Sequence, residues 1–199
     1  MTASKWDLLD RAHEALRIAV IGVPADAWDR PTPSEKWNVT QVFQHAAGDQ
    51  LAYAARLTGG SGPAEDPFEP SGTLAGPPAQ LLEPALAAAA EAFAGLAPGT
   101  AEVEVPLPPF TVSVETAVGA AALDAAVHAW DISVATGQAS PLTDALASAL
   151  RPAADALVEP LRGFAYGPEL APPAGEASGP ADALLAFLGR DSQWAPPAV

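Results

Sequence analysis

Hydrophobic residues recur at steps of three and four positions along five long segments, the spacing that places side chains on one face of an α-helix. Stretches between these segments are rich in proline and glycine and show no period, which predicts ordered loops. A sixth, shorter periodic run precedes a polar tail. The pattern therefore predicts a chain of helices joined by long loops. The predicted helices span residues 4–23, 38–59, 81–99, 114–137, 142–164 and 181–188, and the loops span residues 24–37, 60–78 and 165–180.

Individual residues mark where the predicted helices begin, end or bend. Asn38 is a favourable N-cap and is followed three positions later by Gln41, a variant of the capping box. Gly137 stands where a helix commonly ends with a left-handed residue. Pro152 and Pro160 interrupt the fifth periodic segment. Because proline removes a helical hydrogen bond, we expect breaks or kinks in that helix.

Two non-helical segments carry further signals. Residues 101–114 alternate between polar and apolar around Pro108 and Pro109, which predicts a short β-hairpin or an extended excursion. The loop over residues 59–78 contains several glycines, prolines and acids, and we expect it on the surface. Closure of this loop over a site, as a lid, is one hypothesis for its role.

Composition limits the class of protein. A chain of 199 residues with 49% hydrophobic and 17% charged residues is long enough and apolar enough for one folded domain, which we expect to span residues 1–199. The formal net charge is −15. Because nucleic acids and anionic lipids are bound through lysine and arginine, this charge argues against both as partners.

The chain contains no cysteine. Disulfides, thiolate metal ligands and a cysteine nucleophile are therefore excluded, and any thiol chemistry needs an external thiol. No stretch approaches the roughly 18 apolar residues of a membrane span, and we expect a cytoplasmic protein.

The helix around residues 121–137 carries ionisable residues on the face that should be buried. Asp124 and His128 are four positions apart, so their side chains leave the helix on successive turns of one face, and Asp131 falls on the same stripe. Unpaired charge in that position would cost several kcal/mol, on the order of the penalties for isolated buried groups. An aspartate and a histidine at this spacing form half of a common divalent-metal site, and His45 of the second helix is the natural third ligand. A buried His/Asp hydrogen-bonded pair without metal is the alternative.

The neighbouring polar residues allow two interpretations each. Asp131 either accepts a hydrogen bond from a ligand imidazole, in the second coordination shell, or is a capping or salt-bridged acid. Asp49, four positions after His45, either has the same second-shell role or lies in solvent. We expect His13 to be a core histidine bonded to a neighbour. Trp130 is expected to pack against another helix. Three arginines either recognise a carboxylate or lie on the surface: Arg151, Arg162 and Arg190.

Three segments together resemble a known family: PTPSEKWNVTQVFQHAAG, LDAAVHAWDISVATGQ and LLAFLGRDSQW. In order and spacing they are similar to the DinB-like proteins related to mycothiol-dependent maleylpyruvate isomerase. Ser34 stands where the closest subgroup usually has cysteine and Ser192 where it has proline. The resemblance implies an all-α, up-down four-helix bundle around a divalent metal, usually zinc, with nickel or another ion as alternatives. Carried onto this chain, the metal ligands are His45, Asp124 and His128, with aspartate at a position where maleylpyruvate isomerase has glutamate.

Three protein ligands leave a coordination position open for water or substrate, as in catalytic zinc sites. The resemblance implies mycothiol as a cosubstrate and a transferase or isomerase that acts on a small electrophile. Two other functions stay open: a biosynthetic enzyme that uses the same bundle without thiol, as a cyclase or hydrolase, and a non-catalytic protein that binds a metal or small molecule. We expect a monomer or homodimer with a small-molecule substrate.

Overall fold

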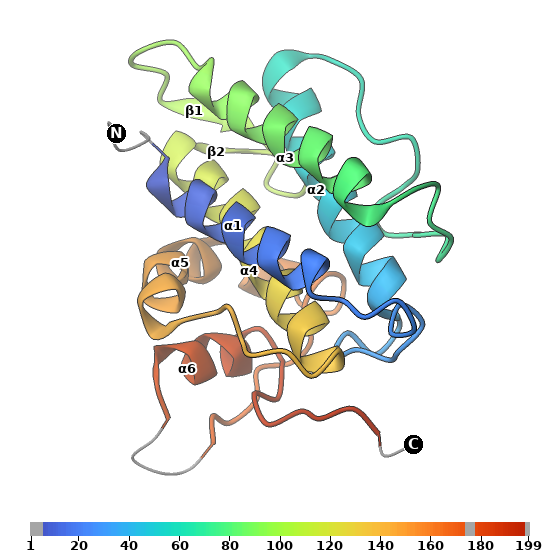
Figure 1. Ribbon diagram of the computed structural model, residues 1–199. Coiled ribbons are helices and arrows are strands. Elements are labelled where there is room, and N and C mark those ends of the chain that lie inside the picture. Colours follow the sequence, from blue (N-terminus) through green and yellow to red (C-terminus); the bar gives the residue numbers. More distant parts are fainter. Residues whose placement is uncertain (1–5, 174–177, 198–199) are drawn as a thin grey trace.

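The computed structural model describes residues 6–173 and 178–197, and within these ranges the chain is mainly helical (Figure 1). The predicted helix start at residue 4 lies outside the described residues. A two-stranded sheet and one short 3-10 helix complete the described elements. In chain order they are α1 (Asp7–Ile21), α2 (Val39–Thr58), α3 (Pro78–Ala94), β1 (Glu102–Glu104), β2 (Thr111–Ser113), α4 (Val114–Ala135), α5 (Asp144–Leu157), η1 (Glu159–Leu161) and α6 (Pro180–Phe187).

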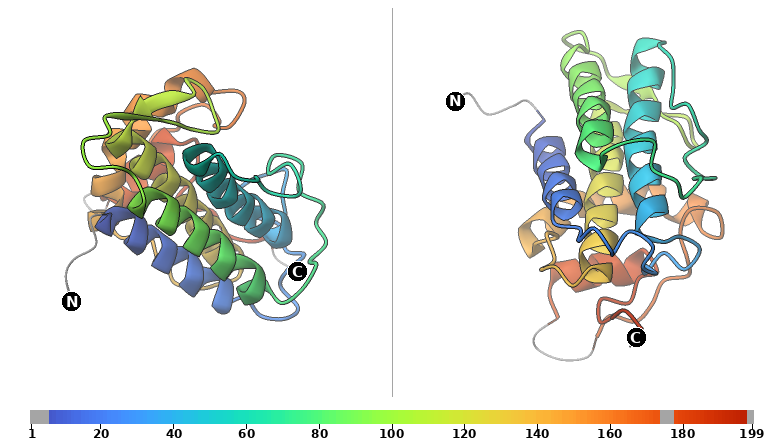
Figure 2. Two further views of the ribbon diagram at one scale, coloured as in Figure 1. Left: turned by 90° about the horizontal axis from the view of Figure 1, so that it is seen from above. Right: turned by 45° about the vertical axis from the view of Figure 1, so that its right-hand side comes forward.

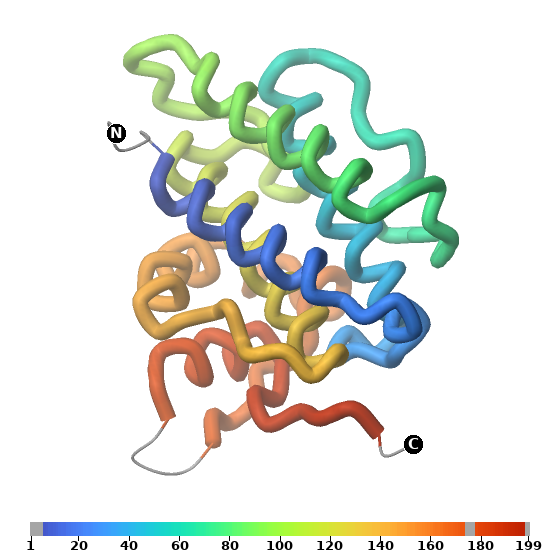
Figure 3. The backbone as a smooth tube through the Cα atoms, viewed as in Figure 1, coloured from blue at the N-terminus to red at the C-terminus, as the bar shows by residue number. Residues whose placement is uncertain are grey.

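Helices α1 to α4 form a four-helix bundle. Helix α4 packs against α1 and α2, and α3 contacts α1 and α2 on the other side (Figures 1 and 2). The long connection after α2 returns along the bundle, so α2 and α3 run in the same direction (Figure 3). Helices α5 and α6 pack together at one end, where α5 also contacts α4. The predicted all-α, DinB-like bundle with a short hairpin and a short C-terminal helix is confirmed. Its predicted up-down order is wrong for α2 and α3, because the long connection between them returns the chain to the end where α2 begins.

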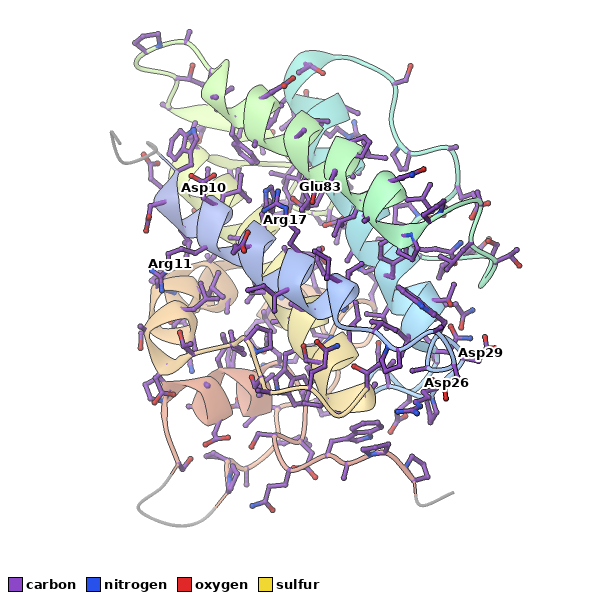
Figure 4. All side chains as sticks on the ribbon, viewed as in Figure 1. Asp10, Arg11, Arg17, Asp26, Asp29 and Glu83 are labelled. Carbon is purple, nitrogen blue, oxygen red and sulfur yellow. The ribbon has the colours of Figure 1, made fainter. Side chains whose placement is uncertain are left out.

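Polar contacts tie the outer helices to one another. Arg17 of α1 faces Glu83 of α3, and its Nε donates to Glu83 Oε1 at 2.7 Å (Figure 4). In the core, His13 Nε2 lies 2.8 Å from Gln50 Oε1, and Gln50 Nε2 donates to the carbonyl of Ala121. This chain of bonds joins α1, α2 and α4, and His13 is the hydrogen-bonded core histidine that the sequence predicts.

Helix ends follow local chemistry, with some shifts from the predicted limits. Asn38 and Gln41 form the reciprocal capping box at the start of α2. Helix α3 begins with Pro78, three residues before the predicted start, because proline suits the first turn of a helix. The fifth predicted helix divides in two at Val158, and Pro160 opens the 3-10 turn η1. Pro152 lies within α5, so of the breaks or kinks predicted at the two prolines, a break occurs only near Pro160.

Helix α4 is buried almost all round and crosses α5 at close range. A Cβ atom added at Gly119 would lie 2.6 Å from the Cβ of Ala153, a separation that real structures do not tolerate. The alanine-rich sequence of α4 permits such approaches because its side chains are short. Trp130 is 2% exposed and packs in the core, as predicted. No helix in the part of the chain that the structure describes is both long and apolar enough to cross a membrane.

Candidate metal centre

Three side chains from α2 and α4 converge at one point. His45 Nε2 lies 3.3 Å from Asp124 Oδ1, and His128 Nε2 lies 3.4 Å from the same oxygen. One ligand atom from each residue lies within 4.8 Å of the others. Both histidines are buried, and the Asp124 side chain is 13% exposed. The bundle thus joins the pair at positions 124 and 128 to the histidine of α2, which the sequence places 79 positions earlier than Asp124.

The second ring nitrogen of each histidine is held by an acceptor. His45 Nδ1 donates to the carbonyl oxygen of Pro67 at 2.9 Å, from the loop between α2 and α3. His128 Nδ1 donates to Asp131 Oδ2 at 2.9 Å. A hydrogen on Nδ1 directs the lone pair of a neutral imidazole to Nε2, the atom that faces Asp124 in both residues. This arrangement sets tautomer and ring orientation in histidines that bind metals.

Asp124 supports the same fit. Its second oxygen, Oδ2, is buried and has no hydrogen-bond partner among the described residues. Burial opposes ionisation, but the neighbouring His128 and His45 lower the pKa of Asp124 below its usual value. The carboxylate is thus charged, has an unused oxygen and lies between two imidazole nitrogens. Two histidines and one carboxylate match the ligand preferences of Zn²⁺ and related divalent ions.

Asp131 is held from its far side by an arginine near the end of the chain. Arg190 Nε donates to Asp131 Oδ1 at 3.0 Å, and Arg190 Nη2 donates to Oδ2 at 2.9 Å. Burial opposes ionisation of the fully buried Asp131, but Arg190 and His128 lower its pKa to about 2. Burial likewise disfavours a charged imidazole, but Asp124 and Asp131 raise the pKa of His128 to about 9. Arg190 was a candidate for recognising a carboxylate, but Asp131 was not predicted as its partner.

The three residues open onto a cavity of about 810 Å³. Trp37 lies against the ring of His45 with centroids 4.6 Å apart, and Phe68 meets the same ring at 5.1 Å. Phe164 lies against Phe68 at the outer side. Other lining residues come from α2, from the loop after η1 and from the C-terminal segment: Asp49, Tyr53, Tyr166, Arg190, Asp191 and Trp194.

The other predicted site residues divide between the cavity and the surface. Asp49 is buried and lines the cavity, so the interpretation that it lies in solvent is wrong. It also forms no hydrogen bond to an imidazole among the described residues. Arg151 pairs with Asp155, and Arg162 pairs with Glu159, both outside the cavity lining. Tyr53 was not predicted as a site residue, although it lies four positions after Asp49 on the same face of α2.

Comparisons with known proteins place the chain in a family. The model of the mycothiol maleylpyruvate isomerase N-terminal domain matches residues 9–133. Two uncharacterized proteins of Mycobacterium tuberculosis, from strains CDC 1551 and H37Rv, are each 35% identical over 183 residues, which is 90% of this chain and 94% of theirs. No solved structure matches the chain significantly. The chain belongs to the mycothiol maleylpyruvate isomerase N-terminal domain family.

Proposed function

We propose that the chain is a metal-dependent enzyme, with a divalent ion held by His45, Asp124 and His128. The observation that carries this proposal is the convergence of two Nε2 atoms and a charged carboxylate at the wall of a cavity. The unpartnered Asp124 Oδ2 supports it, because a buried carboxylate oxygen without a partner is costly unless a ligand satisfies it. Zinc is the ion that we favour, with nickel or another divalent ion as the alternative.

The protein residues around the site have separable roles. A bound divalent ion supplies Lewis acidity, which lowers the pKa of a thiol or water and polarises a carbonyl. Pro67 and Asp131 orient the two imidazoles through their Nδ1 atoms. Trp37 and Phe68 cover the ring of His45 and exclude water from that side. The open cavity beside the ligands leaves room for a small substrate.

We further propose that the nucleophile is a thiol brought in as a cosubstrate, and that the reaction is a transfer or isomerisation on a small electrophile. The chain has no cysteine of its own, and its family is named for a mycothiol-dependent isomerase. In the simplest addition, sulfur bonds to the electrophilic carbon of an enoyl group and the thiol proton ends on the neighbouring carbon. The adduct then contains every atom of both reactants.

Elemental analysis of untagged protein tests the metal site. We expect about one divalent ion per chain, lost in His45→Ala and in His128→Ala. His13→Gln is the matched control, since His13 is also buried but lies in the bonded chain with Gln50 and should leave the metal content unchanged. Retention of metal by both site variants would refute the assignment.

Turnover tests the chemistry. Protein loaded with zinc is mixed with mycothiol and a panel of enoyl and epoxide electrophiles, and the loss of free thiol is followed. Activity should disappear when a chelator removes the metal and return when zinc is restored. Metal-independent thiol consumption would contradict the proposed role of the ion, and metal-dependent hydrolysis without thiol would favour the thiol-free enzyme.

A further inference from the structure

One face of α2 presents three polar side chains to the cavity at steps of four residues. His45, Asp49 and Tyr53 all line it. Positions four apart lie on successive turns, about 6 Å along the helix axis. Asp49 therefore lies one turn from the metal ligand of the same helix, inside the same cavity, and Tyr53 lies one turn further.

Asp49 differs from the other two buried acids of the site. It is 6% exposed, and no hydrogen bond or ion pair joins it to any of the described residues. Asp124 faces two histidines, and Asp131 is bonded to His128 and Arg190. A buried carboxylate without a partner is unfavourable. Burial and then the charge of Asp124 raise the pKa of Asp49 well above its usual value, which is a consequence of the missing partner.

The cationic side chains around Asp49 have other partners or lie in solvent. The charge of His128 lowers the pKa of Asp49, against the larger effects of burial and Asp124, but both ring nitrogens of His128 already face the carboxylates of Asp124 and Asp131. Arg190 lines the cavity, but two of its nitrogens are bonded to the carboxylate of Asp131. Lys36 lines it from an exposed position. Tyr53 and Tyr166 provide aromatic surface in the same cavity, and burial is the main cause of the raised pKa of both phenols, to which the charge of Asp49 adds. An unpaired carboxylate close to aromatic rings suits an ammonium group, which is attracted to both.

We propose that Asp49 is the anchor of a subsite for an ammonium group on the substrate. This inference rests on the proposed metal-dependent function and names its substrate class: a small electrophile that carries an amine about one helical turn, roughly 6 Å, from the metal. The subsite disfavours carboxylates, because their charge would face that of Asp49. The net charge of −15 works in the same direction, since it attracts cations to the molecule.

Three two-carbon thiols test the subsite in protein loaded with Co²⁺. They are 2-aminoethanethiol, 2-mercaptoethanol and mercaptoacetate, which carry an ammonium, a hydroxyl and a carboxylate group, respectively, at the end away from sulfur. Sulfur binding to cobalt gives an absorption band from which each Kd is read. Comparison of each thiol between wild type and variant cancels its intrinsic affinity for the metal.

Asp49→Asn should weaken the binding of 2-aminoethanethiol about tenfold, change the Kd of 2-mercaptoethanol by no more than about twofold and tighten the binding of mercaptoacetate severalfold. These changes follow from the loss of a nearby buried negative charge. Asp49→Glu keeps the negative charge, so the three thiols should bind this variant in the same order of affinity as they bind the wild-type protein. Glu35→Gln removes an exposed acid from the cavity wall, where solvent screens its charge. This control should change the Kd of each of the three thiols little.

The outcomes separate the two proposals. A lack of Co²⁺ binding by the wild-type protein would refute the metal site itself. If the wild-type protein binds stoichiometric Co²⁺ but Asp49→Asn changes the Kd of all three thiols equally, only the ammonium subsite is overturned.

Discussion

Arg190 holds Asp131 through two parallel hydrogen bonds, of 3.0 and 2.9 Å, across 59 positions of the chain. The same Asp131 oxygen that accepts from Arg190 Nη2 also accepts from His128 Nδ1. Arg190 lies beyond residues 9–133, the part that the family model matches. The orientation of His128, a proposed metal ligand in α4, therefore depends on the C-terminal segment.

Arg190→Met should weaken metal binding about 10- to 100-fold, the usual cost of losing a group that orients a ligand. Arg190→Lys should recover only part of this loss, since lysine cannot form the paired bonds. Metal affinity is measured by competition with a chromophoric chelator. Because Arg190 lines the cavity, added guanidinium should partly restore the affinity of Arg190→Met.

Arg151→Met is the matched control for this prediction. Arg151 pairs with Asp155 on the exposed side of α5 and should not affect metal affinity. A similar loss of metal affinity in both arginine variants would indicate that the substitutions destabilise the fold, and would contradict a specific role of Arg190.

Metal binding should release a proton. Against the effect of burial, Asp124 and Asp131 raise the pKa of His128 to about 9 in the metal-free protein, so the imidazole is protonated at neutral pH. The ring must lose that proton to bind metal, so about one proton should leave per ion at pH 7.5, and affinity should rise about tenfold per pH unit up to about pH 9. Calorimetry in buffers of different ionisation enthalpy measures the proton. No release at pH 7.5 would contradict a histidine ligand with this pKa.

The stability of the metal-free protein should fall as pH rises. The folded pKa of His128, about 9, exceeds the unfolded value of 6.5, so its contribution is fully present below pH 6.5 and is lost as pH rises through 9. The difference between the folded and unfolded pKa values of His128 corresponds to about 3 kcal/mol of unfolding free energy at most. Urea unfolding of chelator-treated protein at pH 6.5 and 9.5 measures it. His128→Gln should remove most of the dependence, and an unchanged slope in this variant would assign the effect to another group.

Gly119→Ala should destabilise the bundle by about 1–3 kcal/mol, because the added methyl would lie too close to the Cβ of Ala153. Ala153→Gly removes the opposing methyl, so the double variant should recover most of the loss apart from the cost of a glycine in α5. Urea unfolding of the two single variants and the double variant measures the coupling. Additive losses would show that α4 and α5 do not meet at this point.

Periodicity and spacing predicted most of the fold and the central group of the site. The step of four between Asp124 and His128 fixes their common face before any packing is known, and few other residues qualify to join them. The family resemblance added the four-helix bundle, although its implied up-down order is wrong for α2 and α3, which run in the same direction. Asp131, the partner of the His128 imidazole, lies on the predicted face of α4. The partner of His45 and the partner of Asp131 were harder to predict, because the loop carbonyl of Pro67 and the distant Arg190 have no periodic relation to these residues.

The position of Arg190 depends on a turn that the sequence pattern does not resolve. Gly189 has a positive φ of 78°, and a Cβ there would lie 2.8 Å from the carbonyl oxygen of Pro168. Only the packed structure shows that this turn directs the next side chain to Asp131. Propensity alone likewise does not decide between a break and a continuous helix at Pro152, which lies within α5.

His45 Nδ1 donates its hydrogen bond to a backbone carbonyl, that of Pro67, so the orientation of this imidazole does not depend on which side chain occupies position 67. Every amino acid at position 67 supplies a carbonyl, so sequence drift there leaves the acceptor in place. Loop length has the opposite effect, since adding or deleting a residue between α2 and position 67 shifts the carbonyl away from the ring. Natural variants of this chain should accordingly exchange residues freely in that loop but conserve its length up to position 67.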